Sequence, residues 1–415
     1  MKKKVFLFFI IAAFLACKKP YDPPYVAGPT GYLVVEGIIS NGADSAVIKL
    51  SRTVSLDKKT ALAPELNATV SVQSDQGVSY PFIETANGNY TNTELNLDDT
   101  HKYRLSIKTA KNEQILSDYV PVVNAPPIDS VYYDIKGTVQ GPGLNIKVNT
   151  HDPSGKVRYF RWDYQETWEI QSSFDSKYKS NGDTVLKRDL INDDIFTCWQ
   201  GSTSSSIVIG SSARLSQPII SNAPIISIAS FEEKLGVEYS ILVNQYALTA
   251  DGYKFYENLK KNTQDLGTLF AAEPSEITGN IHSVTNPAKP VVGYFCVGKA
   301  SSQRIFIRKG ELPQNWVSYL YYHDCMLFVD TKDNSPRCCY YSYDLGGDGT
   351  INQVDQFINY NKPDYYAYAG TLGLLPVDTI RATPQSTIIL GYTAAVHECV
   401  DCTLRGTNKM PAFWK

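Results

Sequence analysis

The fold class is decided by three short segments near the start of the chain: LVVEGIIS (33–40), SAVIKLS (45–51) and ATVSVQS (68–74). In each of them apolar residues alternate with polar or small ones, which is the period of a β-strand with one buried face. Turn sequences lie between and after such segments, as Asp75-Gln76-Gly77 and Asn87-Gly88. This part of the chain is therefore predicted to be all-β.

Residues 31–125 are predicted to form a β-sandwich. Leu97 lies six residues before Tyr103, and Tyr103 opens a segment in which apolar side chains alternate. This arrangement is similar to the tyrosine corner of immunoglobulin-like and fibronectin III-like sandwiches, in which the tyrosine hydroxyl bonds to the backbone just upstream. The alternative is an ordinary tyrosine in an exposed strand.

A second β-sandwich is predicted over residues 126–309. Pro126 and Pro127 mark the boundary, because two prolines stiffen a linker and end a strand. Beyond them DSVYYDI, LNIKVNT and RYFRWDYQETWEI have the composition of strands, and Trp162 and Trp168 are predicted core residues. The expected fold class is mainly β, with tandem immunoglobulin-like/fibronectin III-like β-sandwiches.

One segment interrupts the β pattern. Within residues 249–269, Tyr253, Tyr256 and Leu259 recur at helical spacing with Lys and Glu between them. This pattern predicts one amphipathic helix inserted in the second sandwich and packed across it. Residues 310–415 form a Cys/Tyr-rich C-terminal segment, predicted to be an extension packed on the second domain.

The N-terminal sequence MKKKVFLFFIIAAFLAC predicts an export signal. Its apolar run is shorter than the roughly 20 residues that a membrane-spanning helix needs. Because the run ends in Cys17, residues 1–17 are interpreted as a lipoprotein signal peptide with lipidation at Cys17, and the proline-rich residues 18–30 as a tether. The alternative is an ordinary signal peptide with a free Cys17. The formal net charge of −3 gives no reason to expect a nucleic-acid partner.

Seven further cysteines bear on the compartment. An exported chain meets an oxidising environment, so six of them are disulfide candidates: Cys198, Cys325, Cys338, Cys339, Cys399 and Cys402. Their connectivity is left open. Cys296 lies in the apolar run VVGYFCV and is the predicted free cysteine, since a buried thiol behaves as a small hydrophobe.

The sequence from Asp344 to Asp355 is similar to a calcium-binding loop, as found in dockerin modules. Such a loop places oxygen ligands at fixed positions around a glycine. The candidate ligands are Asp344, Asp348, Thr350 through its carbonyl, Asn352 and Asp355. A structural calcium ion is therefore a candidate cofactor, and the alternative is a glycine-rich acidic turn.

Other motifs do not support an enzyme. Residues 293–300 (GYFCVGKA) come within one residue of a phosphate-binding loop, but the last position has no hydroxyl and the segment is predicted to be a strand. His323, Cys325, His397, Cys399 and Cys402 have zinc-ligand chemistry, but disulfides are favoured for these cysteines. No nucleophile elbow or His-Glu-x-x-His motif is found. The protein is predicted not to be an enzyme.

Several segments resemble a known family. They are YALTADGYKFYENLKKNT (246–263), PSEITGNIHSVTNPAKPVVGYFCV (274–297) and the ending CVDCTLRGTNKMPAFW (399–414), with the opening LVVEGIIS and the Cys198-Trp199 pair. The chain resembles a Bacteroidota outer-membrane lipoprotein family known as domain of unknown function 4249. It departs from that family in the long Cys- and Tyr-rich stretch 310–390.

The resemblance implies an outer-membrane lipoprotein, often encoded beside a TonB-dependent receptor, and no catalytic residues. We therefore expect a lipid-anchored binding protein, held in the membrane by its acylated cysteine, that is an accessory of such a receptor in ligand capture or nutrient uptake. The face of the outer membrane on which it lies is left open. The alternatives are a structural or adhesive surface lipoprotein with a calcium-stabilised loop, and an uncharacterised hydrolase.

Overall fold

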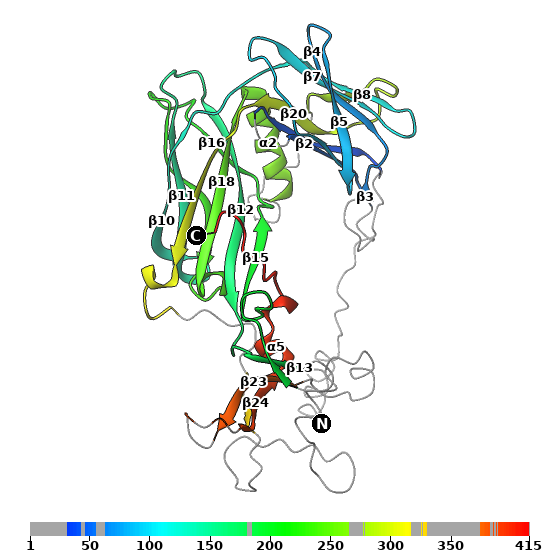
Figure 1. Ribbon diagram of the computed structural model, residues 1–415. Coiled ribbons are helices and arrows are strands. Elements are labelled where there is room, and N and C mark those ends of the chain that lie inside the picture. The colour runs from blue at the N-terminus through cyan, green and yellow to red at the C-terminus, as the bar shows by residue number, and fades with distance from the viewer. Residues whose placement is uncertain are drawn as a thin grey trace, which may run out of the picture.

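The computed structural model describes residues 31–42, 46–54, 63–180, 185–264, 277, 279–316, 325, 327–329, 374–381, 385, 387 and 389–414. The described chain is mainly β, as the sequence predicts, with one long helix. Figure 1 shows a curled sheet at the top, a sandwich of long strands below it at the left, and a small C-terminal module at the bottom.

The first unit is one sheet built from β1 (Leu33–Ser40), β2 (Ala46–Arg52), β3 (Ala63–Pro64), β4 (Thr69–Ser74), β5 (Ser79–Ala86), β6 (Asn89–Asn92), β7 (Lys102–Lys108), β8 (Gln114–Ser117), β9 (Val120–Pro121), β19 (Ile281–Ser283) and β20 (Val292–Gly298). Its ends approach each other, since Val122 forms a parallel bridge with Val297 of β20. One continuous sheet therefore curls around its core, where the sequence predicts two facing sheets.

The alternating side chains of this curled sheet build its core. In β1 and β7 every second residue is buried, including Leu33, Val35, Leu105 and Ile107. Tyr103 is 1% exposed; its hydroxyl donates to the Asp98 carbonyl at 3.1 Å and accepts from the Asp98 N–H at 2.8 Å. The predicted corner contact is thus present.

Two strands of the curled sheet come from the part of the sequence assigned to the second domain. β20 pairs in parallel with β1, and β19 pairs with β8. Phe295 and Val297 of β20 enter the first core. The predicted division at residue 125 therefore does not separate the strands of the two units, because β20 returns to pair with β1 (Figure 1).

The second unit is a sandwich of two sheets. One sheet has β10 (Ile128–Thr138), β11 (Gly141–His151) and β17 (Ile219–Ala229); the other has β12 (Tyr159–Gln171), β15 (Thr197–Thr203), β16 (Val208–Ser211), β18 (Glu238–Leu248) and β21 (Ser301–Arg308). Short 3-10 helices lie at Glu233–Leu235 (η1) and Lys309–Glu311 (η2). Trp162 is buried in its core and Trp168 is partly buried against it, while Leu312 and Trp316 extend this core past residue 309.

Helix α2 (Ala250–Thr263) lies where the two units meet. Thr249 caps it by accepting a hydrogen bond from the N–H of Gly252 at 3.1 Å. Its buried Phe255 and Tyr256 share an apolar cluster with Tyr294 and Cys296 of β20. The helix therefore packs against both units, whereas the sequence placed it on the sandwich alone. The predicted end at residue 269 lies outside the described residues.

The C-terminal module is built from β13 (Tyr178–Ser180), β14 (Val185–Lys187), β22 (Phe328–Val329), β23 (Leu374–Arg381), β24 (Ile389–Val396), α5 (His397–Val400) and η3 (Cys402–Leu404), with the loop of residues 188–196. β13 belongs with β23 because the N–H of Lys177 donates to the Val377 carbonyl at 2.8 Å. The last described residues, 405–414, are called the C-terminal tail below.

Candidate functional site

Among the described residues, one disulfide joins the C-terminal module to the sandwich and a second lies within the module. Cys198 of β15 is bonded to Cys402 of η3, and Cys325 is bonded to Cys399 of α5. These are four of the six disulfide candidates. Cys296 is the predicted free cysteine, and it is buried outside any disulfide; burial raises the pKa of its thiol to about 12. A thiol with that pKa stays protonated and unreactive at neutral pH.

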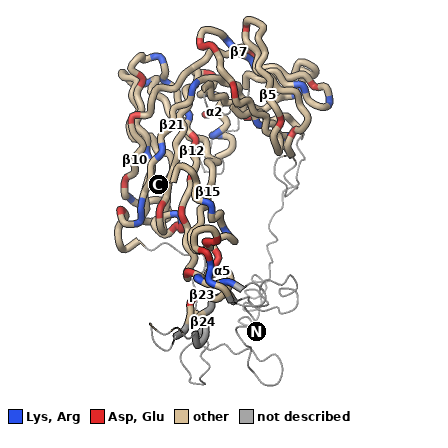
Figure 2. The backbone as a smooth tube through the Cα atoms, viewed as in Figure 1, with Lys and Arg blue, Asp and Glu red and all other residues tan. Residues whose placement is uncertain are grey.

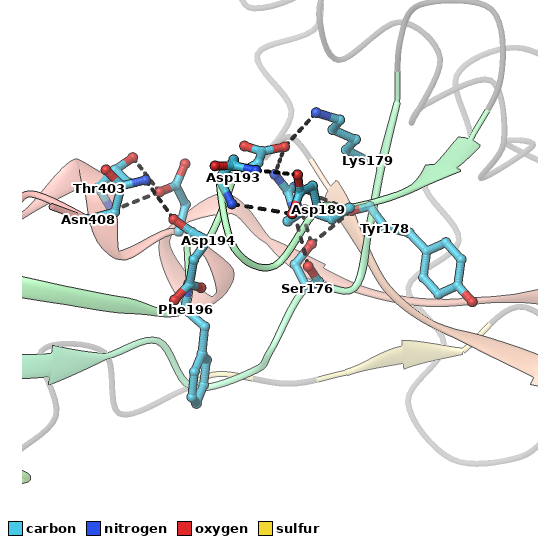
Figure 3. A network of polar contacts seen from close by, with 12 residues as sticks. Ser176, Tyr178, Lys179, Asp189, Asp193, Asp194, Phe196, Thr403 and Asn408 are labelled. Atoms are coloured by element: carbon cyan, nitrogen blue, oxygen red, sulfur yellow. Dashed lines mark hydrogen bonds and ion pairs between the residues drawn. The ribbon is translucent and has the colours of Figure 1, made fainter. Parts of the chain in front are cut away.

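Arg188 organises the loop at the edge of this module, drawn in Figure 3. It is 8% exposed, and its Nε donates to the Ser176 carbonyl at 3.0 Å. Its Nη1 lies 3.1 Å from Oδ2 of Asp193, which also receives Lys179 Nζ at 2.6 Å. A guanidinium with this many acceptors fixes the loop backbone in one conformation.

The same loop is tied to the C-terminal tail. Asn408 Nδ2 donates to the Asp194 carbonyl at 2.7 Å, while the Asp194 carboxylate accepts from the N–H of Phe196 at 2.8 Å (Figure 3). Trp199 and Thr407 exchange two backbone hydrogen bonds of 2.8 and 3.0 Å. The tail thus extends the sheet beside β15 and covers an edge that would otherwise present unpaired backbone groups.

The tail ends against the outer face of the sandwich. Trp414 is 6% exposed and packs edge-on against Phe306 and Trp199, with ring centroids 5.5 and 6.3 Å away. The Arg304 guanidinium lies 3.6 Å from the centre of the Phe413 ring. The Phe-Trp ending is therefore an anchor for the tail.

Apolar side chains are exposed on this rigid module. Ile191 is 91% exposed, and Leu186, Leu190 and Leu404 are each 43% to 52% exposed. The first three follow one another along β14 and the loop that Arg188 holds. Figure 2 shows both charge signs around α5, and in the sequence Leu186 and Leu190 are separated by the charged Lys187, Arg188 and Asp189. Exposed apolar side chains that follow one another along a hydrogen-bonded loop are candidates for a binding surface.

The sandwich also buries a charged group, Glu166. Its carboxylate receives Tyr239 Oη and Ser202 Oγ, each at 2.8 Å, and Lys234 Nζ at 2.9 Å. Burial, with the neighbouring Glu166 charge, raises the pKa of Tyr239 well above its ordinary value. These groups are paired with one another, and the cluster fixes η1 on β12.

Several predicted sites fall elsewhere. Cys17, Cys338, Cys339 and the candidate calcium ligands Asp344, Asp348, Thr350, Asn352 and Asp355 lie outside the described residues. Residues 293–300 lie on and just after strand β20, in keeping with the strand prediction. Cys325, Cys399 and Cys402 are in disulfides, so they have no thiolate with which to bind a zinc ion. Among the described residues, none of the helices has the length and apolar character to span a membrane.

The sequence did not single out Arg188 or its loop. The segment RDLINDD (188–194) has one arginine among three aspartates, which is a signal for local ion pairing. From the sequence alone, the segment 188–194 is predicted only to be a polar loop.

Comparison with known proteins identifies a family. Residues 18–304 match the family described as Domain of unknown function (DUF4249), so the match ends within β21, and α5, η3 and the C-terminal tail lie beyond it. A search of curated proteins gives no match. Because residues 18–304 are more than half of the 415 residues, the chain belongs to the DUF4249 family.

Proposed function

We propose that this chain is a lipid-anchored outer-membrane binding protein that serves as an accessory of a TonB-dependent receptor in ligand capture or nutrient uptake. The N-terminal signal with Cys17 at its end supports the anchor. The lipoprotein class rests on that signal and on the family resemblance. The receptor rests on the family resemblance.

One observation carries the binding role: the exposed apolar side chains of the C-terminal module are held rigidly. Ile191 lies within the loop segment that Arg188 fixes through Ser176 and Asp193. Asp189 accepts from the N–H of Ile191 at 3.0 Å and so fixes the backbone of Ile191 itself. A loop with a preordered backbone loses little backbone entropy when a partner covers it, which favours binding.

The test is affinity purification of tagged full-length protein from gently solubilised native outer membrane, with cross-linking and mass spectrometry. We expect a TonB-dependent receptor in near-stoichiometric amount, with cross-links to lysines of the C-terminal module. Ile191→Asp should lower receptor recovery at least tenfold, because it places a charge in the contact. Val139→Asp is the matched control, since Val139 is equally exposed on the β10–β11 turn.

Two results would overturn this proposal. One is that no TonB-dependent receptor is recovered, which would favour an adhesive or structural surface protein. The other is that Ile191→Asp recovers as much receptor as Val139→Asp, which would place the contact elsewhere. Metabolic labelling with a lipid precursor tests the anchor separately: label should be lost in Cys17→Ser, and labelling that persists there would exclude Cys17 as the anchor.

A further inference from the structure

The two disulfides of the C-terminal module converge on one short turn. Cys399 and Cys402 are three residues apart, and their partners Cys325 and Cys198 come from distant parts of the chain. Ile195 contacts both sites: its side chain belongs to the apolar cluster around Cys399, and its carbonyl accepts from the N–H of Cys402 at 2.8 Å. The module therefore has two covalent links with one common junction.

The two cysteines of this junction have the Cys-x-x-Cys spacing. Val400 ends α5 in the helical conformation, and Asp401 is extended with φ −121° and ψ 97°. Cysteines at this spacing form the reversible disulfides of thiol–disulfide oxidoreductases. A bond between Cys399 and Cys402 is therefore compatible with their separation along the chain.

The four sulfurs differ in access. Cys198, Cys399 and Cys402 are 0–2% exposed, whereas Cys325 is only partly buried. An external thiolate therefore reaches Cys325 first. Attack at that sulfur would expel Cys399 as a thiolate, three residues before Cys402 in the chain.

We infer that the module is a thiol-exchange relay in which a monothiol such as glutathione moves the Cys402 bond from Cys198 to Cys399. In the first step the glutathione thiolate attacks Cys325, the Cys325–Cys399 bond breaks, and Cys399 leaves as a thiolate. In the second step Cys399 attacks Cys402, the Cys198–Cys402 bond breaks, and Cys198 leaves and takes the proton that glutathione gave up.

The exchange is balanced. Two disulfides and one thiol are present before it, and two disulfides and one thiol remain after it, so no oxidant or further reductant is needed. The products are a glutathione adduct on Cys325, a Cys399–Cys402 disulfide and a free Cys198. The covalent link between β15 and η3 is then lost, and the C-terminal tail stays on β15 through hydrogen bonds such as that from Gln200 Nε2 to the Arg405 carbonyl at 2.8 Å.

The test is incubation of the full-length oxidised protein with reduced glutathione, followed by acid quenching, alkylation and peptide mapping of every cysteine by mass spectrometry. We expect three products to appear together in equal amounts: glutathione on Cys325, the Cys399–Cys402 link and alkylated Cys198. If glutathione accumulates on Cys325 while Cys198–Cys402 stays intact, or if a Cys198–Cys399 link forms instead, the relay is wrong.

Two variants sharpen the result. Cys325→Ser leaves Cys399 without its partner, so this protein should be isolated with a Cys399–Cys402 bond and a free Cys198. Cys399→Ser is the matched control: it breaks the same native disulfide but removes the attacking sulfur, so Cys198–Cys402 should remain. Retention of Cys198–Cys402 in both variants would also overturn the inference.

Discussion

Gln245 links the core of the sandwich to the segment that leads into it from the curled sheet. Its side chain is completely buried. The Oε1 atom accepts from Trp162 Nε1 at 2.9 Å, and Nε2 donates to the Pro126 carbonyl at 2.9 Å and to Thr150 Oγ1 at 3.0 Å. The Gln245 amide thus provides hydrogen-bond partners both for the Trp162 indole N–H in the core and for the Pro126 carbonyl in the linker.

We predict that Gln245→Met destabilises the protein by about 2–5 kcal/mol. Methionine fills a similar volume but leaves the Trp162 N–H and the Pro126 carbonyl buried without partners, at about 1–3 kcal/mol each. The hydroxyl of Thr150 loses less, because it also lies 3.5 Å from the Pro127 carbonyl. The added apolar contact of methionine offsets a small part of the loss.

The measurement is urea unfolding followed by circular dichroism and tryptophan fluorescence. Gln165→Met is the matched control, because Gln165 is exposed on the neighbouring strand β12 and its loss should change the free energy of unfolding by less than about 0.5 kcal/mol. Trp162→Phe should cost less in the Gln245→Met background than in the native protein, since the indole N–H is then already unpaired. A destabilisation below about 1 kcal/mol, or no coupling, would refute this reasoning.

Three further predictions rest on the described contacts. Tyr103→Phe should lower the free energy of unfolding by about 1–3 kcal/mol in urea, because Asp98 loses both backbone contacts to the hydroxyl; an unchanged midpoint would show that the corner is not stabilising. Cys402→Ser removes a disulfide between residues 204 positions apart, which is worth up to about 5 kcal/mol of chain entropy. In oxidising buffer the melting temperature of this variant should be lower than that of the native protein. Under full reduction the two melting temperatures should be the same. Burial acts to raise the pKa of Asp152, but hydrogen bonds led by that from the N–H of Val157 outweigh it and lower that pKa. The stability from Asp152 is therefore present above about pH 3.9 and lost as the pH falls through the lowered pKa; urea unfolding from pH 7 to pH 2 should show a shallower acid loss in Asp152→Asn.

Features that depend on neighbouring residues were predictable. Alternation in residues 33–40, the contact of Tyr103 with the backbone upstream and the helical spacing after Thr249 each reflect interactions within a few residues of sequence. The partner of β20 was not predictable in this way. An apolar run states that a strand is buried, but its period is the same whichever sheet buries it.

The candidate site was predictable to a smaller extent. Composition and the export signal expected at the N-terminus predict the bonded cysteines as a class, because the chemistry of a thiol is local. Their pairing depends on which segments the fold brings together, and Cys198 meets Cys402 only after 204 residues. The role of Arg188 was hidden for the same reason, since two of its acceptors are the backbone carbonyls of Ser176 and Tyr178, which any residue could supply.

The order of the strands along the chain differs from the order in which they pair in the curled sheet. Eight strands of the curled sheet are made before residue 118, but β20 follows only after the nearly complete sandwich has been synthesised. Before β20 is present, β1 has one edge without a pairing strand. The sandwich is likewise incomplete until β21 (residues 301–308) pairs with β18. Both units are therefore expected to close only once β20 and β21 are present, and residues 31–125 produced alone would carry an unpaired edge that favours aggregation.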